Sequence, residues 1–213
     1  GETYDANFEL GDWHTNDYND TQWHKAETRA LSESVLLQPK RFETVKNREE
    51  LQVKSIHQPN KNTAIFNMGQ NNVGVPKLQL PMKKGDTLKI RFAEMLDQDS
   101  TMYTKNYRSA KSTDYYIAAT DGVITYKPTF TFHGYQYIEL SGYAKDVKPE
   151  KDWVTSHVQY SNFKKNGTFI SSHKKLNQLQ SNISWGLKGN FFDVPTDCPQ
   201  RDERLGWTGD AQI

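Results

Sequence analysis

The chain has 213 residues, a formal net charge of +1 and 25% charged residues. This length fits one large domain or two small ones, and the near-zero net charge gives no indication of nucleic-acid or membrane-surface binding. Aromatic residues make up 12% of the chain, which favours a folded protein over a disordered one.

Several protein classes are excluded by what the sequence lacks. No apolar run reaches the roughly 18–20 residues of a membrane-spanning helix, so no membrane span is expected. The first residues have neither the basic nor the apolar region of a signal peptide. The single cysteine, Cys198, excludes an internal disulfide and a multi-cysteine zinc site. No HExxH pair and no glycine-rich phosphate loop is present, so the sequence predicts neither a metal nor a cofactor.

The N-terminal region combines aromatic side chains with turn-forming polar residues and lacks a helical period. This composition predicts short strands or an irregular extension. We therefore assign residues 1–33 to an N-terminal β extension or to the end of a preceding β-sandwich domain.

Residues 34–148 repeat a pattern of short strands and turns. Apolar and polar residues alternate, and Gly, Asn or Asp separates the segments, which is typical of an antiparallel β-sandwich. Gly69, with Asn71-Asn72 beyond it, is expected to end one strand, and Thr120-Asp121-Gly122 is a hairpin signal. The predicted strands are 34–37, 42–46, 64–68, 77–81, 87–93, 114–118, 121–126 and 135–140.

Residues 149–170 are predicted to be a linker followed by β strands, because residues 154–160 alternate once more. The period then changes to that of a helix over about 172–188, with its apolar residues on one face. Ser172 is a plausible N-cap, and Gly189 a plausible stop. Because one helix cannot bury its own apolar face, we expect it to need packing partners outside these residues. The apolar positions are Leu176, Leu179, Ile183 and Leu187.

Ionisable side chains are concentrated in residues 193–210. Five carboxylates, two arginines, one thiol and one indole fall within these 18 positions. Such a segment is a poor core element but a good site, since burial and arginine neighbours can separate carboxylate pKa values.

Composition leaves other interpretations of this segment open. It could be a solvated, salt-bridged loop that Trp207 anchors to a core. Calcium could bind carboxylates of the segment, although their spacing matches no EF-hand loop. Cys198 could act as a nucleophile, although no histidine lies near it in the sequence.

The string VPTDCPQRDERLGWTGD resembles the signature of the bacterial α-L-rhamnosidases of glycoside hydrolase family 78. Four other stretches also resemble that family, so that the resemblance covers essentially the whole chain: GETYDA, FNMGQNNVGV, FAEMLDQDS and FTFHGYQYIELSG. The resemblance implies a mainly β fold. Antiparallel, jelly-roll-like β-sandwich domains, with residues 34–148 as the concanavalin-like one, would precede an (α/α)6 barrel. Residues 171–213 would supply the first helix and the catalytic loop of that barrel.

The resemblance also implies an activity: removal of terminal non-reducing α-L-rhamnose by an inverting acid/base mechanism. Glu203 matches the general acid, and Asp197 and Asp210 match carboxylates that bind rhamnose hydroxyls. Arg201 matches an arginine beside the acid, and Trp207 could stack on the sugar. Some family members have arginine directly before the acidic glutamate. Here Asp202 intervenes, and Glu203 remains the favoured acid.

Inversion needs a general base about 6.5–9.5 Å from the acid, with water between the two carboxyl groups. In the family this base is a glutamate far downstream, and no matching stretch occurs in these 213 residues. We therefore expect an N-terminal portion of a longer enzyme, truncated just after the acid motif and inactive alone. The remainder of the catalytic domain would be its partner.

A non-catalytic carbohydrate-binding β-sandwich is the alternative function, since exposed aromatic residues could stack on sugars. An ordered C-terminal segment with Glu203 facing a pocket would favour the enzyme. His133, Tyr135 and Tyr137 are expected in the core or in cross-strand pairs rather than at a binding surface. The resemblance implies rhamnose-containing oligosaccharides, polysaccharides or glycosides as partners, and a periplasmic or extracellular location.

Overall fold

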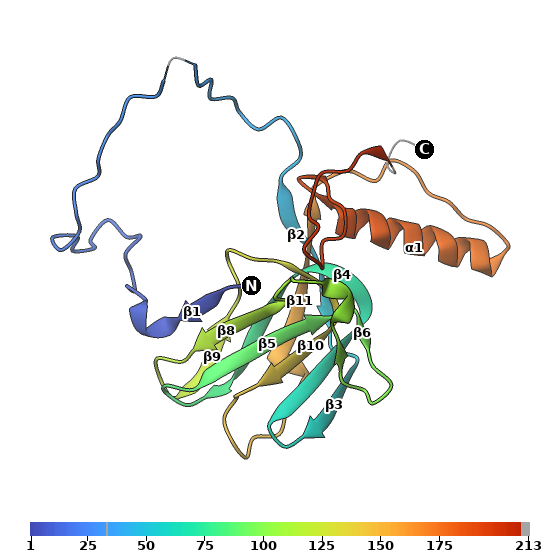
Figure 1. Ribbon diagram of the computed structural model, residues 1–213, viewed down its shortest axis with the longest axis horizontal. Helices are drawn as coiled ribbons and strands as arrows, with labels where there is room; N and C mark the ends of the chain where they lie inside the picture. The colour runs from blue at the N-terminus through green and yellow to red at the C-terminus, as the bar shows by residue number, and fades with distance from the viewer. Residues whose placement is uncertain (33, 210–213) are drawn as a thin grey trace.

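A computed structural model describes residues 1–32 and 34–209 of the chain. Its centre is a sheet of nine strands in the order β1-β8-β5-β10-β4-β11-β2, with β3 and β9 also paired to β4 (Figure 1). All pairs in this sheet are antiparallel except β1 with β8. The strands are β1 (Thr3–Asp5), β2 (Val45–Gln52), β3 (Ser55–Asn60), β4 (Thr63–Met82), β5 (Thr87–Ala93), β8 (Thr113–Ile117), β9 (Gly122–Tyr126), β10 (His133–Ser141) and β11 (Val154–Ser161).

Strand β4 is shared by both halves of the sheet and makes it curl. Its first half pairs with β3 and β10, and its second half pairs with β11 and β9. The curl encloses one core of apolar side chains from strands on both sides of β4. Phe66, Leu80, Ile90, Phe92 and Ile138 are all fully buried in it. The predicted mainly β, antiparallel architecture is therefore confirmed.

The turn signal at Gly69 marks a bulge rather than the end of a strand. Tyr135 of β10 pairs with Asn72, and Tyr137 pairs with Asn67, so residues 68–71 of β4 lie opposite the single residue Gln136. Gly69 has a φ of +76°, a left-handed conformation that glycine adopts without a steric penalty. The predicted break at this point is wrong, because β4 resumes its pairing beyond the bulge.

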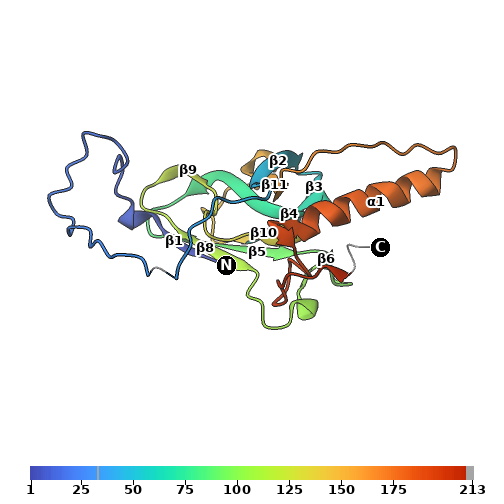
Figure 2. The ribbon, with the colours of Figure 1, turned by 90° about the horizontal axis from the view of Figure 1, so that it is seen from above.

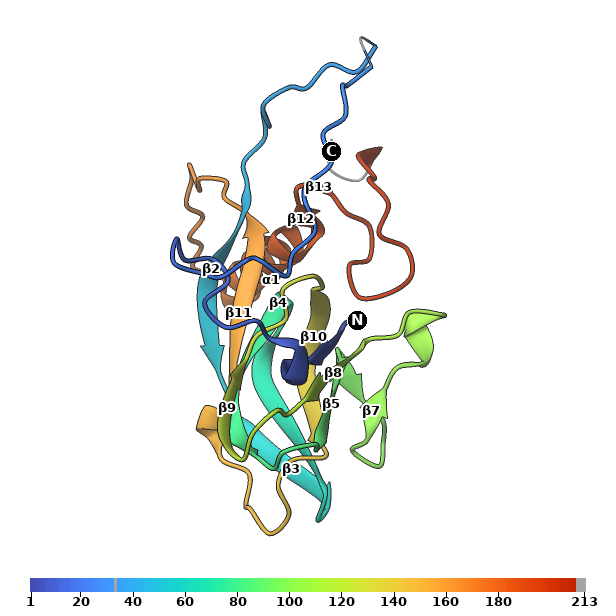
Figure 3. The same cartoon turned by 90° about the vertical axis from the view of Figure 1, so that its left-hand side faces the viewer.

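A long segment between β1 and β2 has little regular structure. It swings away from the sheet in a wide arc, drawn in blue in Figures 2 and 3. The strand predicted over 34–37 is wrong, and of 42–46 only its last two residues join β2. Leu36, Leu37 and Phe42 are all exposed, so these apolar residues do not form the buried face of a strand.

Helix α1 (Lys174–Asn190) follows β11 and projects from the sheet (Figure 1). The predicted helix is confirmed, but its predicted ends are wrong. The N-cap is His173 rather than Ser172, and its side chain makes no capping hydrogen bond. The Asn177 side chain accepts a hydrogen bond from the Ser171 N–H and donates one to the Ser171 carbonyl. Gly189 lies inside the helix, where an added Cβ would lie 3.2 Å from Val73 of β4, so this glycine permits close packing. No helix of the described residues is long and apolar enough to cross a membrane.

The apolar face of α1 is uncovered, as expected for a helix without packing partners. No residue of the helix is buried, and its four predicted apolar positions are 43–55% exposed. The end of the helix docks on the sheet through Lys188, which pairs with Glu49 of β2 and lies 4.2 Å from the centre of the Trp185 ring. Hydrogen bonds from Lys188 and Tyr160 lower the pKa of Glu49 against the opposing effect of burial.

A histidine–aspartate pair is buried where β8 and β10 approach the C-terminal segment. His133 Nε2 lies 3.0 Å from Asp114 Oδ1, and both side chains are almost completely buried. The ring of His133 stacks on Phe92, with the ring centres 4.0 Å apart. Tyr135 is also fully buried and Tyr137 is half-buried. These residues are core residues, as expected.

This buried histidine should make stability depend on pH. Burial lowers the pKa of His133, although Asp114 opposes the effect. The unfolded chain, with a histidine pKa of about 6.5, takes up a proton as the pH falls below that value while the folded chain does not. The contribution of the neutral, buried His133 to the free energy of unfolding is then fully present above pH ~6.5. Below that pH it decreases by up to about 1.4 kcal/mol per pH unit.

Urea unfolding at pH 7.5 and pH 5.5 measures this loss, and His133→Gln should show a smaller one. Burial also lowers the pKa of His157, but that residue is the same in both chains and cancels in the comparison. An equal loss in wild type and variant would show that His133 is not responsible.

Candidate active site

The candidate site is a closed loop that follows α1. The chain turns back through β12 (Phe191–Phe192) and β13 (Val194–Pro195). Thr196 and Gly206 then form an isolated bridge, and the Asp197 N–H donates to the Leu205 carbonyl at 2.9 Å. Residues 197–205, called the acid loop below, are thus held at their base by backbone hydrogen bonds. The sequence predicted this segment as a loop with charged side chains.

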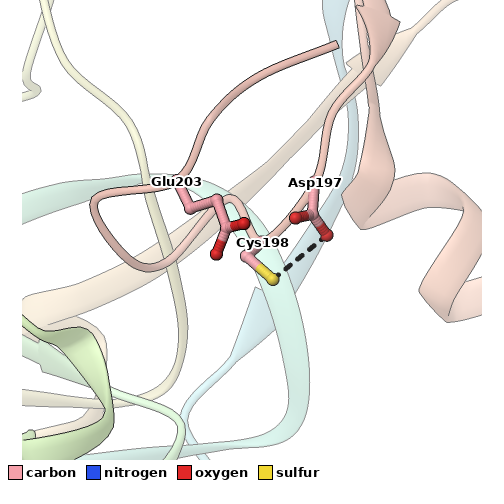
Figure 4. Close-up of side chains that lie close together, drawn as sticks. All are labelled: Asp197, Cys198 and Glu203. Atoms are coloured by element: carbon pink, nitrogen blue, oxygen red, sulfur yellow. Dashed lines mark hydrogen bonds between the residues drawn. The ribbon is translucent and has the colours of Figure 1, made fainter. Parts of the chain in front are cut away.

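Three side chains of the acid loop converge. One polar atom each of Asp197, Cys198 and Glu203 lies within 4.8 Å of the other two (Figure 4). Cys198 has a φ of +49°, and its Sγ–H donates to Asp197 Oδ1 at 3.2 Å. The loop therefore brings together the predicted acid and one predicted sugar-binding carboxylate.

The cysteine of this cluster is a poor nucleophile. Burial raises the pKa of Cys198, and its hydrogen bond to Asp197 raises it further. A thiol must lose its proton to react as a nucleophile, so these surroundings keep it in the unreactive form. Its role in the cluster is to donate a hydrogen bond to Asp197.

Two arginines surround the Glu203 carboxylate. Arg201 Nη2 lies 2.7 Å from Glu203 Oε2, and Arg108 Nη1 lies 2.9 Å from the same atom. These contacts are close but lack hydrogen-bond geometry. Within residues 1–32 and 34–209, neither the buried Oε2 nor the buried Arg201 Nε has a hydrogen-bond partner. Both atoms therefore have unused hydrogen-bonding capacity at the centre of the site.

Asp202 is oriented away from this cluster, towards the sheet. Its Oδ2 accepts hydrogen bonds from the Ser109 hydroxyl and from the Ser109 N–H, the latter at 3.2 Å. The hydrogen bonds from Ser109 lower the pKa of Asp202. An ionised carboxylate that accepts two hydrogen bonds is an anchor and not a proton donor. This arrangement supports Glu203 over Asp202 as the acid.

The remaining predicted site residues lie elsewhere. Trp207 follows the base of the loop and is 53% exposed. The backbone N–H of Trp207 donates a hydrogen bond to the Pro195 carbonyl at 3.0 Å, which orders the base of the loop. Asp210 lies outside the described residues.

Clefts flank the acid loop on two sides. One, of about 510 Å³, lies against α1 and the β4 bulge and is bordered by Asn71, Glu94, Trp185 and Asp197. The other, of about 370 Å³, lies against the sheet and is bordered by Ser112, His133, Arg201 and Arg204. The loop is thus accessible from both sides.

Residues of β10 and of the segment just before it hold the loop in place, and no sequence pattern predicted this role for them. The Arg204 guanidinium donates to the Phe132 carbonyl at 3.0 Å and lies over the Phe132 ring. Gly134 of β10 lets the loop approach closely, because a Cβ there would lie 2.9 Å from the Cβ of Gln200. No local pattern marks these positions, since they act only through a segment about 70 residues further along the chain.

Gly134→Ala should therefore displace the acid loop. We expect a loss of stability of about 1–3 kcal/mol, as is typical of overpacking, together with faster amide exchange in residues 197–205. Urea unfolding and hydrogen exchange of the 213-residue chain measure the two effects. Gly167→Ala is the matched control, since a Cβ at Gly167 meets no atom within 4 Å. Equal loop exchange in the two variants would contradict the close approach at Gly134.

Comparison with known families gives two matches along the chain. Residues 57–160 match the bacterial alpha-L-rhamnosidase concanavalin-like domain, and residues 164–213 match the bacterial alpha-L-rhamnosidase 6 hairpin glycosidase domain. The first ends within β11 and the second contains α1 and the acid loop. The first match therefore covers the sheet from β3 to β11, without β1 and β2, and the second covers the candidate site.

Relatives that are similar in sequence over nearly the whole chain carry the name alpha-L-rhamnosidase. An alpha-L-rhamnosidase of Formosa agariphila is 60% identical over all of this chain, and one of Alteromonas sp. is 50% identical over 99% of it. The chain spans 23% of the length of each.

Solved structures that resemble this chain are also alpha-L-rhamnosidases. The alpha-L-rhamnosidase from Dictyoglumus thermophilum matches with a TM-score of 0.91 and 33% identity, over 99% of this chain and 24% of that one. The Streptomyces avermitilis enzyme, complexed with L-rhamnose, matches with a TM-score of 0.89 and 38% identity, over 98% of this chain and 20% of that one.

Proposed function

Because this chain belongs to the bacterial α-L-rhamnosidases of glycoside hydrolase family 78, we propose that it provides the general acid of a rhamnoside hydrolase. The substrate would be a glycoside, oligosaccharide or polysaccharide with terminal non-reducing α-L-rhamnose. In this proposal residues 171–213 open the catalytic domain, and the β-rich residues before them support it.

One observation carries the proposal: Glu203 lies beside Asp197 in a loop held in a fixed position by its own backbone and by the sheet. A general acid must reach the glycosidic oxygen while other groups hold the sugar. Glu203 would donate its proton to that oxygen as the bond to the rhamnose C1 breaks. Asp197 would accept hydrogen bonds from rhamnose hydroxyls, and Arg201, whose Nη2 lies 2.7 Å from Glu203 Oε2, would remain beside the acid.

Inversion requires a second carboxylate to take a proton from the attacking water. We propose that this base comes from a part of the enzyme outside the present chain. Asp197 and Glu203 have carboxylate oxygens within 4.8 Å of each other, which leaves too little room for the 6.5–9.5 Å separation of an inverting pair. The uncovered apolar face of α1 also supports a longer enzyme, because it needs further helices to bury it.

Hydrolysis of an aryl α-L-rhamnoside, beside other aryl glycosides, tests the proposal. We expect turnover of the rhamnoside by the complete enzyme that contains this chain and none by the 213 residues alone. Cleavage of a different glycoside in preference to the rhamnoside would refute the substrate. Turnover by the isolated chain would place the base within it.

The configuration of the first product tests the mechanism. Proton NMR during the first minutes should show β-L-rhamnose, the product of inversion. The short distance between Asp197 and Glu203 is closer to the 5–5.5 Å of a retaining pair. If α-L-rhamnose appears first, Asp197 becomes a candidate nucleophile and the inverting assignment is wrong.

The alternative of a non-catalytic carbohydrate-binding sandwich has less support. Three tyrosines of the sheet, Tyr116, Tyr126 and Tyr135, are buried, so they do not form a sugar-binding surface. Glu203 borders neither of the two clefts beside the acid loop, so the expectation that it would face a pocket is not met there and does not favour the enzyme.

A further inference from the structure

A short segment of the β-rich region reaches the acid loop. It lies between β7 (Met102–Tyr103) and β8, and it contains a single turn of 3-10 helix over Lys105–Tyr107. Tyr107 anchors it: this side chain is buried, and its hydroxyl accepts a hydrogen bond from the Glu94 N–H at 2.7 Å. The Ala110 N–H donates to the Tyr107 carbonyl at 3.1 Å. The segment is therefore a fixed support on the sheet.

The next residue, Arg108, has an unfavourable backbone conformation. Its φ is +57° and its ψ is −121°, a combination that side chains with a Cβ rarely adopt. Strain of this kind persists where the surrounding structure enforces it, and it is most often found at functional sites. In this conformation the Arg108 guanidinium lies 2.9 Å from Glu203 Oε2 and 4.0 Å from Asp202 Oδ1.

The neighbouring residue contributes a second contact. Ser109 donates two hydrogen bonds to Asp202, from its hydroxyl and from its backbone N–H. Two consecutive residues of the β-rich region thus bind two consecutive carboxylates of the acid loop, over a separation of 93 residues for the Ser109–Asp202 pair. Arg201 also contacts Glu203, but it belongs to the same loop and cannot fix that loop relative to the sheet.

We propose that Arg108 is a positioning residue for Glu203, through which the β-rich region takes part in catalysis. This inference rests on the proposed role of Glu203 as general acid. Glu203 has three rotatable side-chain bonds, and its proton must be delivered to one oxygen of the substrate. The charged groups around it are Arg108, Arg201, Asp202 and Asp197, with the neutral thiol of Cys198 beside them. Of these, only Arg108 joins the Glu203 side chain to the sheet.

Three variants of the complete enzyme test the proposal. Arg108→Met removes the charge, Arg108→Lys restores it, and Lys105→Met removes an exposed cation from the same support. Rates are compared for two aryl α-L-rhamnosides, one with a poor leaving group and one with a strongly activated one, because an activated leaving group departs with little help from an acid.

For Arg108→Met we expect kcat on the poor leaving group to fall about 10²-fold with little change in KM, as for a misplaced catalytic group. The activated substrate should lose much less. Arg108→Lys should recover a large part of the rate, and Lys105→Met should match wild type. Equal losses on both substrates, or no loss on either, would overturn the proposal.

A fourth variant separates positioning from folding. Glycine adopts the backbone conformation of Arg108 without strain, so Arg108→Gly should keep or raise the Tm while kcat on the poor leaving group falls. A variant with both full stability and full activity would overturn the proposal.

Hydrogen exchange gives a readout that needs no substrate. In the complete enzyme, Arg108→Met should speed amide exchange in residues 197–205 roughly threefold or more, as expected for a lost ion pair. Unchanged exchange would overturn the positioning role even if rhamnosides are cleaved. If instead the complete enzyme cleaves no rhamnoside but the loop exchange rises, the proposed function fails and the contact remains established.

Discussion

Replacement of Glu203 by glutamine is expected to lower kcat of the complete enzyme by about 10²–10⁴-fold, the range typical of a lost general acid. Glutamine keeps the size of the side chain but has no proton to donate to the glycosidic oxygen. The loss should be largest for natural rhamnosides and aryl rhamnosides with poor leaving groups, and smallest for strongly activated ones. KM should change little, since the sugar-binding groups are untouched.

The matched control for this variant is Glu139→Gln. Glu139 is also a largely buried carboxylate paired with an arginine, with Arg91 Nη1 2.8 Å away, but it lies in the sheet and not in the acid loop. We expect this control to lose some stability and to keep its kcat. Activity of Glu203→Gln above about a tenth of wild type on a poor leaving group would move the acid to another residue.

Asp197→Asn should give the second largest loss, of a different kind. A carboxylate that accepts hydrogen bonds from sugar hydroxyls contributes about 1.5–3 kcal/mol, so kcat/KM should fall about 10–150-fold. Most of this change should be in KM if Asp197 only binds the sugar. Steady-state kinetics with an aryl α-L-rhamnoside separates the two parameters.

Cys198→Ala provides the comparison for Asp197. It removes the thiol that donates to Asp197 and leaves the carboxylate in place, so its effect should be small. If Asp197→Asn abolishes kcat while KM stays constant, Asp197 takes part in the chemistry. That result would agree with a retaining mechanism and would contradict a role in binding alone.

Local patterns predicted the strands and the helix well where one face of a segment meets the core. The strand predicted over 87–93 has the bounds of β5, because Leu88, Ile90 and Phe92 alternate with exposed or half-buried residues. The apolar period of α1 predicted the helix even though its apolar face is uncovered. In both cases the side-chain period follows the backbone geometry directly.

Predictions failed where distant contacts decide the structure. Gly69 carries the signal of a turn, but the pairing of β4 with β10 continues on both sides of it and makes the turn a bulge. Gly189 resembles a helix stop, yet the helix includes it and ends one residue later, and an added Cβ at Gly189 would lie 3.2 Å from Val73 Cγ2. A glycine in the sequence shows that the backbone can turn, bulge or pack closely at that position. The residues that contact it in the fold determine which of these occurs.

The site was predictable to the extent that it is local. Asp197, Arg201 and Glu203 meet because they share one loop. The string of ionisable residues marked that segment, and the resemblance to family 78 singled out these three residues within it. Arg108, Ser109 and Gly134 belong to the other part of the fold. These residues contact the acid loop only after the sheet has formed and the loop has packed against it, so a local sequence pattern does not reveal them.

The shared strand β4 has a consequence for the order of folding during synthesis. Its partners β10 and β11 end at Ser141 and Ser161, and β2 reaches the sheet only through β11. A nascent chain therefore cannot complete the sheet until Ser161 has left the ribosome, and such long-range pairing is slow. The acid loop is synthesised after every strand that supports it. The sheet can thus serve as a finished template on which the acid loop settles as it emerges.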